Sequence, residues 1–147
     1  MKLTEHFSLN ELTASQEATR HGINNKPSEK VVENLRMLAA LLEQVRELLG
    51  GGAIRISSGY RSLALNRHIG SNDLSAHVRG YAADFTCPAF GKPIEVAKKI
   101  AESNLKFDQL ICEGNAWVHI SCDPQNRRQV LTARFEHGHT YYTTGIT

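Results

Sequence analysis

The chain has 147 residues, 41% of them hydrophobic and 22% charged, and a formal net charge of +2. This composition is ordinary for one globular domain. The charge is mild and the basic residues form no stripe, so we expect no nucleic-acid partner. No apolar run approaches the roughly 18 residues of a membrane span. We therefore expect one monomeric domain over residues 1–147 without a membrane partner.

The cysteines and the N-terminus indicate a protein made in the cytoplasm. Cys87, Cys112 and Cys122 are an odd number of cysteines without a C-x-x-C pair. This argues against a disulfide framework and predicts reduced thiols. The segment 1–7 has no apolar stretch, so we expect no secretory signal peptide.

The first third of the chain carries two helix-start signals. Ser8, with Glu11 three residues later, matches a capping box and predicts a short helix. Ser28 is expected to cap a longer helix that ends near Gly50. The apolar residues of this helix recur at spacings of four and three, which is typical of a face that packs in the core. They are Val31, Leu35, Leu38, Leu42, Val45 and Leu49.

The remainder of the chain predicts mostly strands. We expect strands over 53–57, 81–86, 107–113 and 117–122, short helices over 62–68 and 93–102, and a polar loop over 69–79. Gly114-Asn115-Ala116 indicates a hairpin between the last two strands. The tail from Asp123 onward stays unassigned. Because helices come first and most strands later, the order favours an α+β fold with an antiparallel sheet and packed helices.

Two of the seven histidines stand in a pattern that suits a metal ion. His77 lies in the polar loop, Asp84 on the following strand, and His119 on a distant strand. Two imidazoles and one carboxylate give zinc three ligands and leave a fourth position for water, which is the catalytic rather than the structural pattern. The other five histidines stand among polar residues, and we interpret them as surface residues: His6, His21, His68, His137 and His139.

Several motifs resemble one family of zinc peptidases. The pattern S-x-H-x-x-G-x-A-x-D over 75–84, followed by W-V-H over 117–119, resembles the zinc motif of the zinc D-alanyl-D-alanine carboxypeptidases and L-alanyl-D-glutamate endopeptidases. The pattern S-G-Y-R-S over 58–62, followed by Asn66, resembles the segment before their metal loop. F-S-L-N-E-L over 7–12 and G-I-x-N over 22–25 resemble the start of phage and prophage members. The resemblance spans residues 5 to 122.

The resemblance implies a hedgehog/DD-peptidase fold and a zinc ion held by His77, Asp84 and His119. It implies hydrolysis of an amide bond in the stem peptides of peptidoglycan. Arg61 matches a family arginine that binds a substrate carbonyl or carboxylate, a role that suits a planar guanidinium. Ser75 is expected to hydrogen-bond the substrate or to orient His77. Without a signal peptide, the resemblance fits a phage lysin that acts on the cell wall after release or as part of a virion.

The general base departs from the family pattern. Many members place Asp or Glu three residues before the last zinc histidine, where this chain has Ala116. The nearest acids are Asp108 and Glu113. A three-residue hairpin loop puts Glu113 on the same side of the sheet as His119, whereas a two- or four-residue loop selects Asp108 instead. We prefer Glu113 as the acid–base group, because such three-residue loops are common and Glu113 is nearer to the ligand in sequence.

Two functions of different classes follow from these motifs. The first is a zinc peptidase that cuts peptidoglycan peptides, as a carboxypeptidase or an endopeptidase. The second is a non-catalytic zinc-binding module, such as a phage structural or wall-binding protein, that kept the ligands and lost the chemistry. Ala116 is the feature that favours the second function. A fold without a metal, in which the motif is accidental, is the third and weakest alternative.

Overall fold

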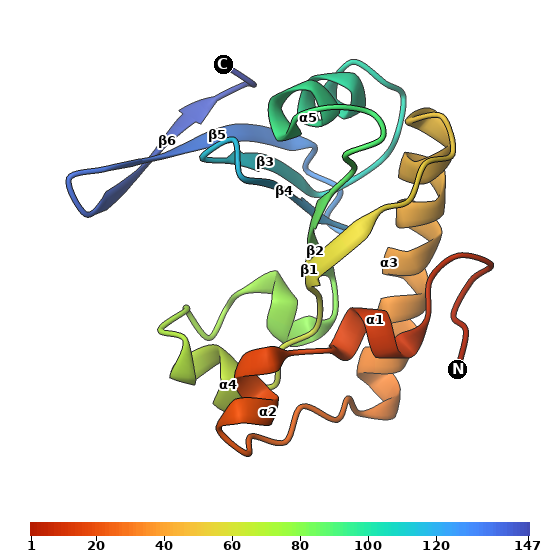
Figure 1. Ribbon diagram of the computed structural model, residues 1–147, viewed down its shortest axis with the longest axis vertical. Coiled ribbons are helices and arrows are strands. Elements are labelled where there is room, and N and C mark those ends of the chain that lie inside the picture. Colours follow the sequence, from red (N-terminus) through yellow and green to blue (C-terminus); the bar gives the residue numbers. More distant parts are fainter.

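Six strands form one sheet in the order β1-β2-β4-β3-β5-β6, and helices cover one of its faces in the computed structural model, which describes residues 1–147 (Figure 1). The strands are β1 (Arg55–Ser58), β2 (Ala82–Thr86), β3 (Gln109–Glu113), β4 (Trp117–Ser121), β5 (Gln129–Glu136) and β6 (His139–Thr144). The helices are α1 (Leu9–Thr13), α2 (Gln16–Arg20), α3 (Glu29–Leu48), α4 (Leu63–His68), η1 (Ala76–Arg79) and α5 (Pro93–Ala101). The predicted α+β class is confirmed.

The sheet is mixed rather than purely antiparallel. Four of the pairings are antiparallel, but β3 and β5 pair in parallel. Both edges of β4 are already paired, one with β3 and the other with β2, so β5 cannot pair with β4. The chain therefore reverses after β4 and returns beside β3, on the side away from β4 and in the same direction as β3. The expectation of an antiparallel sheet is wrong at this one pairing, which lies in the tail that the sequence left unassigned.

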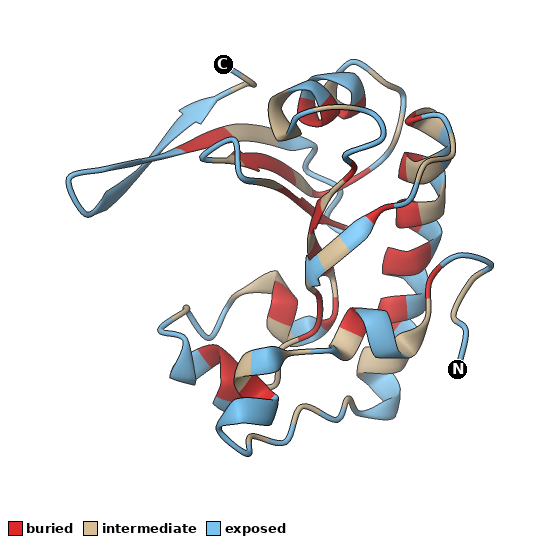
Figure 2. Ribbon diagram, viewed as in Figure 1, coloured by how far each residue is buried: buried red, intermediate tan, exposed pale blue.

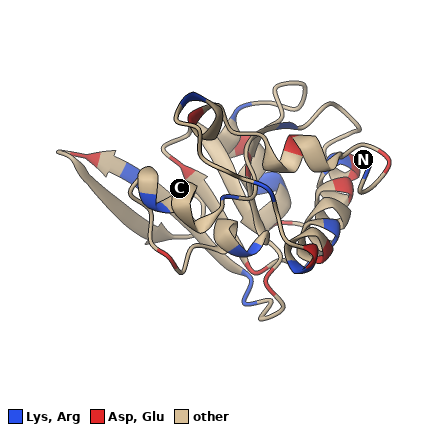
Figure 3. Ribbon diagram, turned by 90° about the horizontal axis from the view of Figure 1, so that it is seen from below, with Lys and Arg blue, Asp and Glu red and all other residues tan.

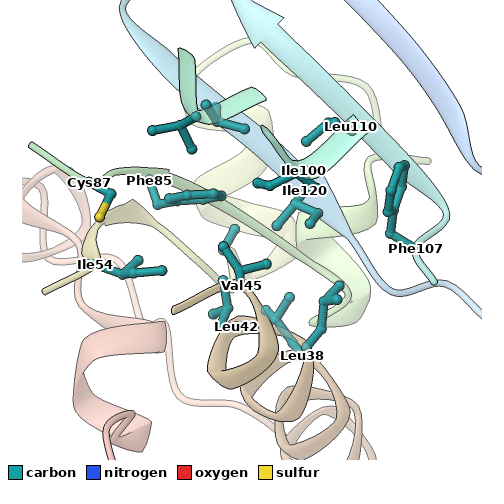
Figure 4. Packing of buried hydrophobic residues seen from close by; sticks show 14 of the residues in the cluster. Leu38, Leu42, Val45, Ile54, Phe85, Cys87, Ile100, Phe107, Leu110 and Ile120 are labelled. Carbon is teal, nitrogen blue, oxygen red and sulfur yellow. The ribbon is translucent and has the colours of Figure 1, made fainter. Parts of the chain in front are cut away.

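The core lies between the sheet and two helices. Figure 4 shows side chains of α3, α5 and the strands meeting there, within a cluster of 22 buried residues. The predicted apolar stripe of α3 is confirmed, because five of its members are buried and Val31 is partly buried against the same cluster. The cysteines are unpaired, as predicted. Burial raises the pKa of the Cys122 thiol to about 12, which keeps it protonated and unreactive.

The helix-start signals act as predicted. Ser8 and Glu11 form a complete capping box at α1, and the Ser28 hydroxyl accepts a hydrogen bond from the Val31 amide at 3.3 Å at the start of α3. Basic and acidic residues alternate along α3 (Figure 3). None of the helices combines the length and the apolar character needed to cross a membrane.

The tail forms the β5–β6 hairpin, which extends beyond the body of the molecule (Figure 1). Every residue of β6 is exposed, and burial in β5 is confined to its middle (Figure 2). His137 and His139 are exposed at its tip, in keeping with their interpretation as surface residues. Strand pairing joins this hairpin to the rest of the sheet. Ala133 of β5 pairs with Glu113 of β3 on one side and with Tyr142 of β6 on the other.

Replacing Leu42 with alanine should destabilise the fold by about 2–5 kcal/mol, because a buried leucine leaves a cavity that the core fills only in part. Leu42 lies on α3 and is fully buried. The free energy of urea unfolding measures the effect. Met37→Ala on the same helix is the control, since Met37 is 44% exposed and should cost much less. Equal losses for the two variants would contradict this packing.

Candidate functional site

The three predicted metal ligands meet on the sheet face opposite the helical core. Asp84 on β2 and His119 on β4 are direct partners across the two strands, so their side chains share one face. His77 reaches the same point from η1. The His119 Nδ1 lies 2.9 Å from Asp84 Oδ1, and the His77 Nε2 lies 3.3 Å from that oxygen. Residues up to 42 positions apart in the sequence are thereby brought together.

The donor set fits a metal ion. Zinc with ligand bonds of about 2.0–2.2 Å holds tetrahedral ligand atoms roughly 3.3–3.6 Å apart, which is close to the spacing found here. The ligand atoms of His77, Asp84 and His119 all lie within 4.8 Å of one another and are shielded from solvent. The His77 Nδ1 lies 2.7 Å from the Gly59 carbonyl oxygen. A carbonyl only accepts, so Nδ1 carries the proton and Nε2 is free for a metal. The group could therefore bind a metal.

Electrostatics favour the protonation states that a metal needs. Burial alone would raise the pKa of Asp84, but the hydrogen bond with His119 and the close approach of His77 hold it well below its ordinary value. Burial lowers the pKa of His77, and the charge of Asp84 offsets this only in part. The carboxylate is therefore ionised and the His77 imidazole neutral, as metal ligation requires.

The loop before Arg61 is fixed by the N-terminal segment of the chain. A Cβ on Gly59 would lie 2.3 Å from the Leu12 carbonyl oxygen, so only glycine fits where the loop passes α1. The Asn25 side chain accepts a hydrogen bond from the Ser62 amide at 2.7 Å and donates one to the Tyr60 carbonyl at 3.1 Å. These contacts give the N-terminal residues a physical role in placing Arg61.

Arg61 and Ser75 lie side by side next to the metal group. The Arg61 Nη2 donates to the Ser75 Oγ at 3.4 Å, while the Arg61 Nε is buried without a hydrogen-bond partner. Burial lowers the pKa of Arg61, and the charges of Asp84 and Glu113 oppose that shift. The Ser75 Oγ also accepts from the His77 amide at 3.3 Å. Ser75 thus caps the turn that holds His77, and its contact with a substrate stays a prediction.

The hairpin register chooses between the two acids. The loop has three residues, with Glu113 opposite Trp117 and Ile111 opposite His119, as the preferred alternative predicts. Glu113 therefore shares the face of His119. Burial and the charge of Asp84 raise its pKa, so Glu113 holds a proton more readily than an exposed glutamate. Its role as the acid–base group stays a prediction.

Asp108 is committed to an ion pair instead. The Arg127 side chain donates to both oxygens of Asp108, at 2.9 and 2.8 Å, and the Arg127 amide adds a third bond at 3.0 Å. The Asp108 side chain is only 3% exposed. These bonds hold the pKa of Asp108 below its ordinary value. A carboxylate with this many donors is a weak base and suits a structural role.

Replacing Arg127 with glutamine should cost about 1–3 kcal/mol of unfolding free energy near neutral pH, because the buried carboxylate loses its charged donors. The pKa of Asp108 is lowered by folding, so its stabilising contribution exists above the unfolded value of about 3.9 and is lost as the pH falls through the folded value. The difference between wild type and variant should therefore shrink in acid. Urea unfolding from neutral pH to below about pH 4 measures this difference. Arg36→Gln is the control, because Arg36 is an exposed residue of α3. A difference that does not change with pH would contradict the pairing.

One cavity of about 510 Å³ unites these residues, and it also includes side chains that the sequence did not single out. Tyr142 of β6 is one of them. It lines the cavity together with Glu113, and burial and the charge of Glu113 raise its pKa. The sequence did contain a signal for this hairpin, because runs rich in β-branched and aromatic residues flank Gly138. That signal could have placed Tyr142 on a strand. Others are Leu74, Arg79 and Arg127.

A comparison with family models agrees with this geometry. The model of the Peptidase M15 family matches residues 5–121, a segment that includes the metal group, Arg61, Ser75 and Glu113. A search of curated proteins gives no match. The matched segment ends at the last residue of β4 and leaves out the β5–β6 hairpin. On this match, which covers most of the chain, the protein belongs to the Peptidase M15 family.

Proposed function

We propose that the protein is a zinc peptidase that hydrolyses an amide bond in the stem peptides of peptidoglycan. One observation carries the proposal: a metal-competent group lies in the same cavity as a second carboxylate, Glu113, and a guanidinium, Arg61. A structural metal site needs neither of these neighbours. Their arrangement is what amide hydrolysis requires.

Each group has a distinct task in this proposal. Zinc held by His77, Asp84 and His119 would supply a Lewis acid that activates water near neutral pH. Glu113 accepts the proton of the attacking water and then passes it to the leaving amine. Its raised pKa suits both halves of this transfer. Arg61 binds the carbonyl oxygen as negative charge develops on it, or a carboxylate of the substrate.

The substrate class rests on the resemblance to the D-alanyl-D-alanine carboxypeptidases and L-alanyl-D-glutamate endopeptidases. The cavity supports it in two ways. Its volume of about 510 Å³ lies in the range that holds small ligands and short peptides. Arg61 and Arg79 both line it, and their charge suits the carboxylates of a stem peptide. We further propose a phage lysin that acts on the wall after release from the host cytoplasm or within a virion.

The alternative is a non-catalytic zinc-binding module, such as a phage structural or wall-binding protein. The observation that favours it is Ala116, because the usual position of the general base has no carboxylate. Glu113 weighs against it, since a carboxylate from the neighbouring strand lines the same cavity. The two functions predict the same metal binding, but only the first predicts hydrolysis of a peptide.

The deciding experiment is peptide release from purified bacterial peptidoglycan. Zinc-loaded protein should release peptides, and the same protein treated with a chelator should not. Fragment masses then identify the bond and separate a carboxypeptidase from an endopeptidase. Zinc-loaded protein that binds peptidoglycan but releases nothing would support the non-catalytic module.

A further inference from the structure

A second group of metal-ligating side chains lies outside the cavity, between α2 and α4. Glu17 on α2, His21 at its end and His68 at the end of α4 offer ligand atoms within 4.8 Å of one another. The two short helices lie side by side at the end of the molecule away from α5 (Figure 1). Both histidines were interpreted as unconnected surface residues, but folding joins positions 47 residues apart.

The geometry of this group matches a shared cation. The Nε2 atoms of His21 and His68 lie 3.3 and 3.5 Å from the same oxygen, Oε2 of Glu17. Ligand atoms around a tetrahedral zinc are separated by roughly 3.3–3.6 Å. Arg20 occupies the other carboxylate oxygen at 3.1 Å, so Oε2 is left to the histidines. Three donors thus converge on one point.

The two imidazole rings also lie close enough together to bind one ion. Their centroids are 4.4 Å apart. All three side chains remain between 37% and 44% exposed, so an ion can reach them from solvent. Two imidazoles and a carboxylate suit a first-row transition metal such as zinc.

We propose that Glu17, His21 and His68 form a second, peripheral site for a transition-metal ion of the zinc class. An ion there would link the end of α2 to the end of α4. Ser62 caps α4 and directly follows Arg61, so the link stiffens the wall of the cavity that holds Arg61. The proposal does not depend on whether the protein is a peptidase.

Metal stoichiometry tests the proposal directly. Tag-free protein is stripped with a chelator, dialysed against dilute zinc and analysed for bound metal. Wild type should hold two ions per chain, and His68→Ala and Glu17→Gln should each hold one. His137→Ala is the matched control, because it removes another exposed histidine that lies outside both groups, and it should still hold two ions.

A second measurement separates this site from the central one. In a His119→Ala background, which disables the central group, added zinc should still raise the midpoint of thermal unfolding. The further change His68→Ala should abolish that rise. The proposal would be overturned by wild type that binds a single ion which His68→Ala still holds, or by His68→Ala and Glu17→Gln variants that still bind two. The cluster would then be a surface ion-pair group only.

Discussion

Replacing Glu113 with glutamine is expected to lower kcat for peptide release by about 10²–10⁴-fold, because general acid–base catalysis contributes on that order. Glutamine keeps the size and the hydrogen-bonding capacity of the side chain but cannot accept the proton of water. Glu113 is not one of the metal-ligating residues, so zinc stoichiometry should not change. The assay is peptide release from purified peptidoglycan with zinc-loaded protein.

The neighbouring acid provides the control for this experiment. Asp108→Asn should lower stability, because it removes a carboxylate that binds Arg127, and should leave kcat largely intact in the folded protein. A Glu113→Gln variant with full activity would remove Glu113 from the mechanism. Loss of activity in Asp108→Asn alone would transfer the acid–base role to Asp108, against the register of the hairpin.

Replacing Asp84 with asparagine is expected to abolish both zinc binding at the central site and hydrolysis. The amide is neutral, whereas both histidines now direct a nitrogen at the charged carboxylate. Loss of a group that hydrogen-bonds to a metal ligand costs roughly 10–100-fold in metal affinity, and loss of a ligand should cost more. Zinc titration of chelator-stripped protein measures the affinity, and peptide release measures the activity.

Stability helps to interpret the Asp84 variant. Zinc should raise the unfolding midpoint of wild type through the central site, and Asp84→Asn should lose that part of the rise. Asp73→Asn is the matched control, because Asp73 is an exposed carboxylate that lies before η1 and pairs with Arg67. Unchanged zinc affinity in Asp84→Asn would show that the ion, if bound, lies elsewhere.

The central site could be predicted because its evidence is local in sequence. His77 and Asp84 belong to one short motif, and His119 lies in a segment that is recognisable as a strand from the sequence. The choice of Glu113 also followed from local turn chemistry, since the length of one hairpin loop fixes which side chains share a face. The choice of Glu113 needed only neighbouring residues, whereas joining His119 to the motif of His77 and Asp84 rested on the family resemblance.

The features that the sequence did not reveal depend on long-range packing. The parallel pairing of β5 with β3 requires knowing that β2 fills the other side of β4. The approach of His21 to His68 depends on how two short helices dock, and neither helix signals the other in its sequence. Asp108 looked like a free acid until folding placed Arg127 against it.

The parallel pairing of β5 with β3 has a consequence for the boundaries of the folding unit. The segment that matches the family ends at residue 121, yet β3 forms its second row of backbone hydrogen bonds with a strand beyond that limit. A fragment cut after Ser121 would leave the edge of β3 open to other chains. The same cut would leave the buried Asp108 without Arg127. The sheet therefore extends beyond the family segment, and β5 and Arg127 are structural parts of it.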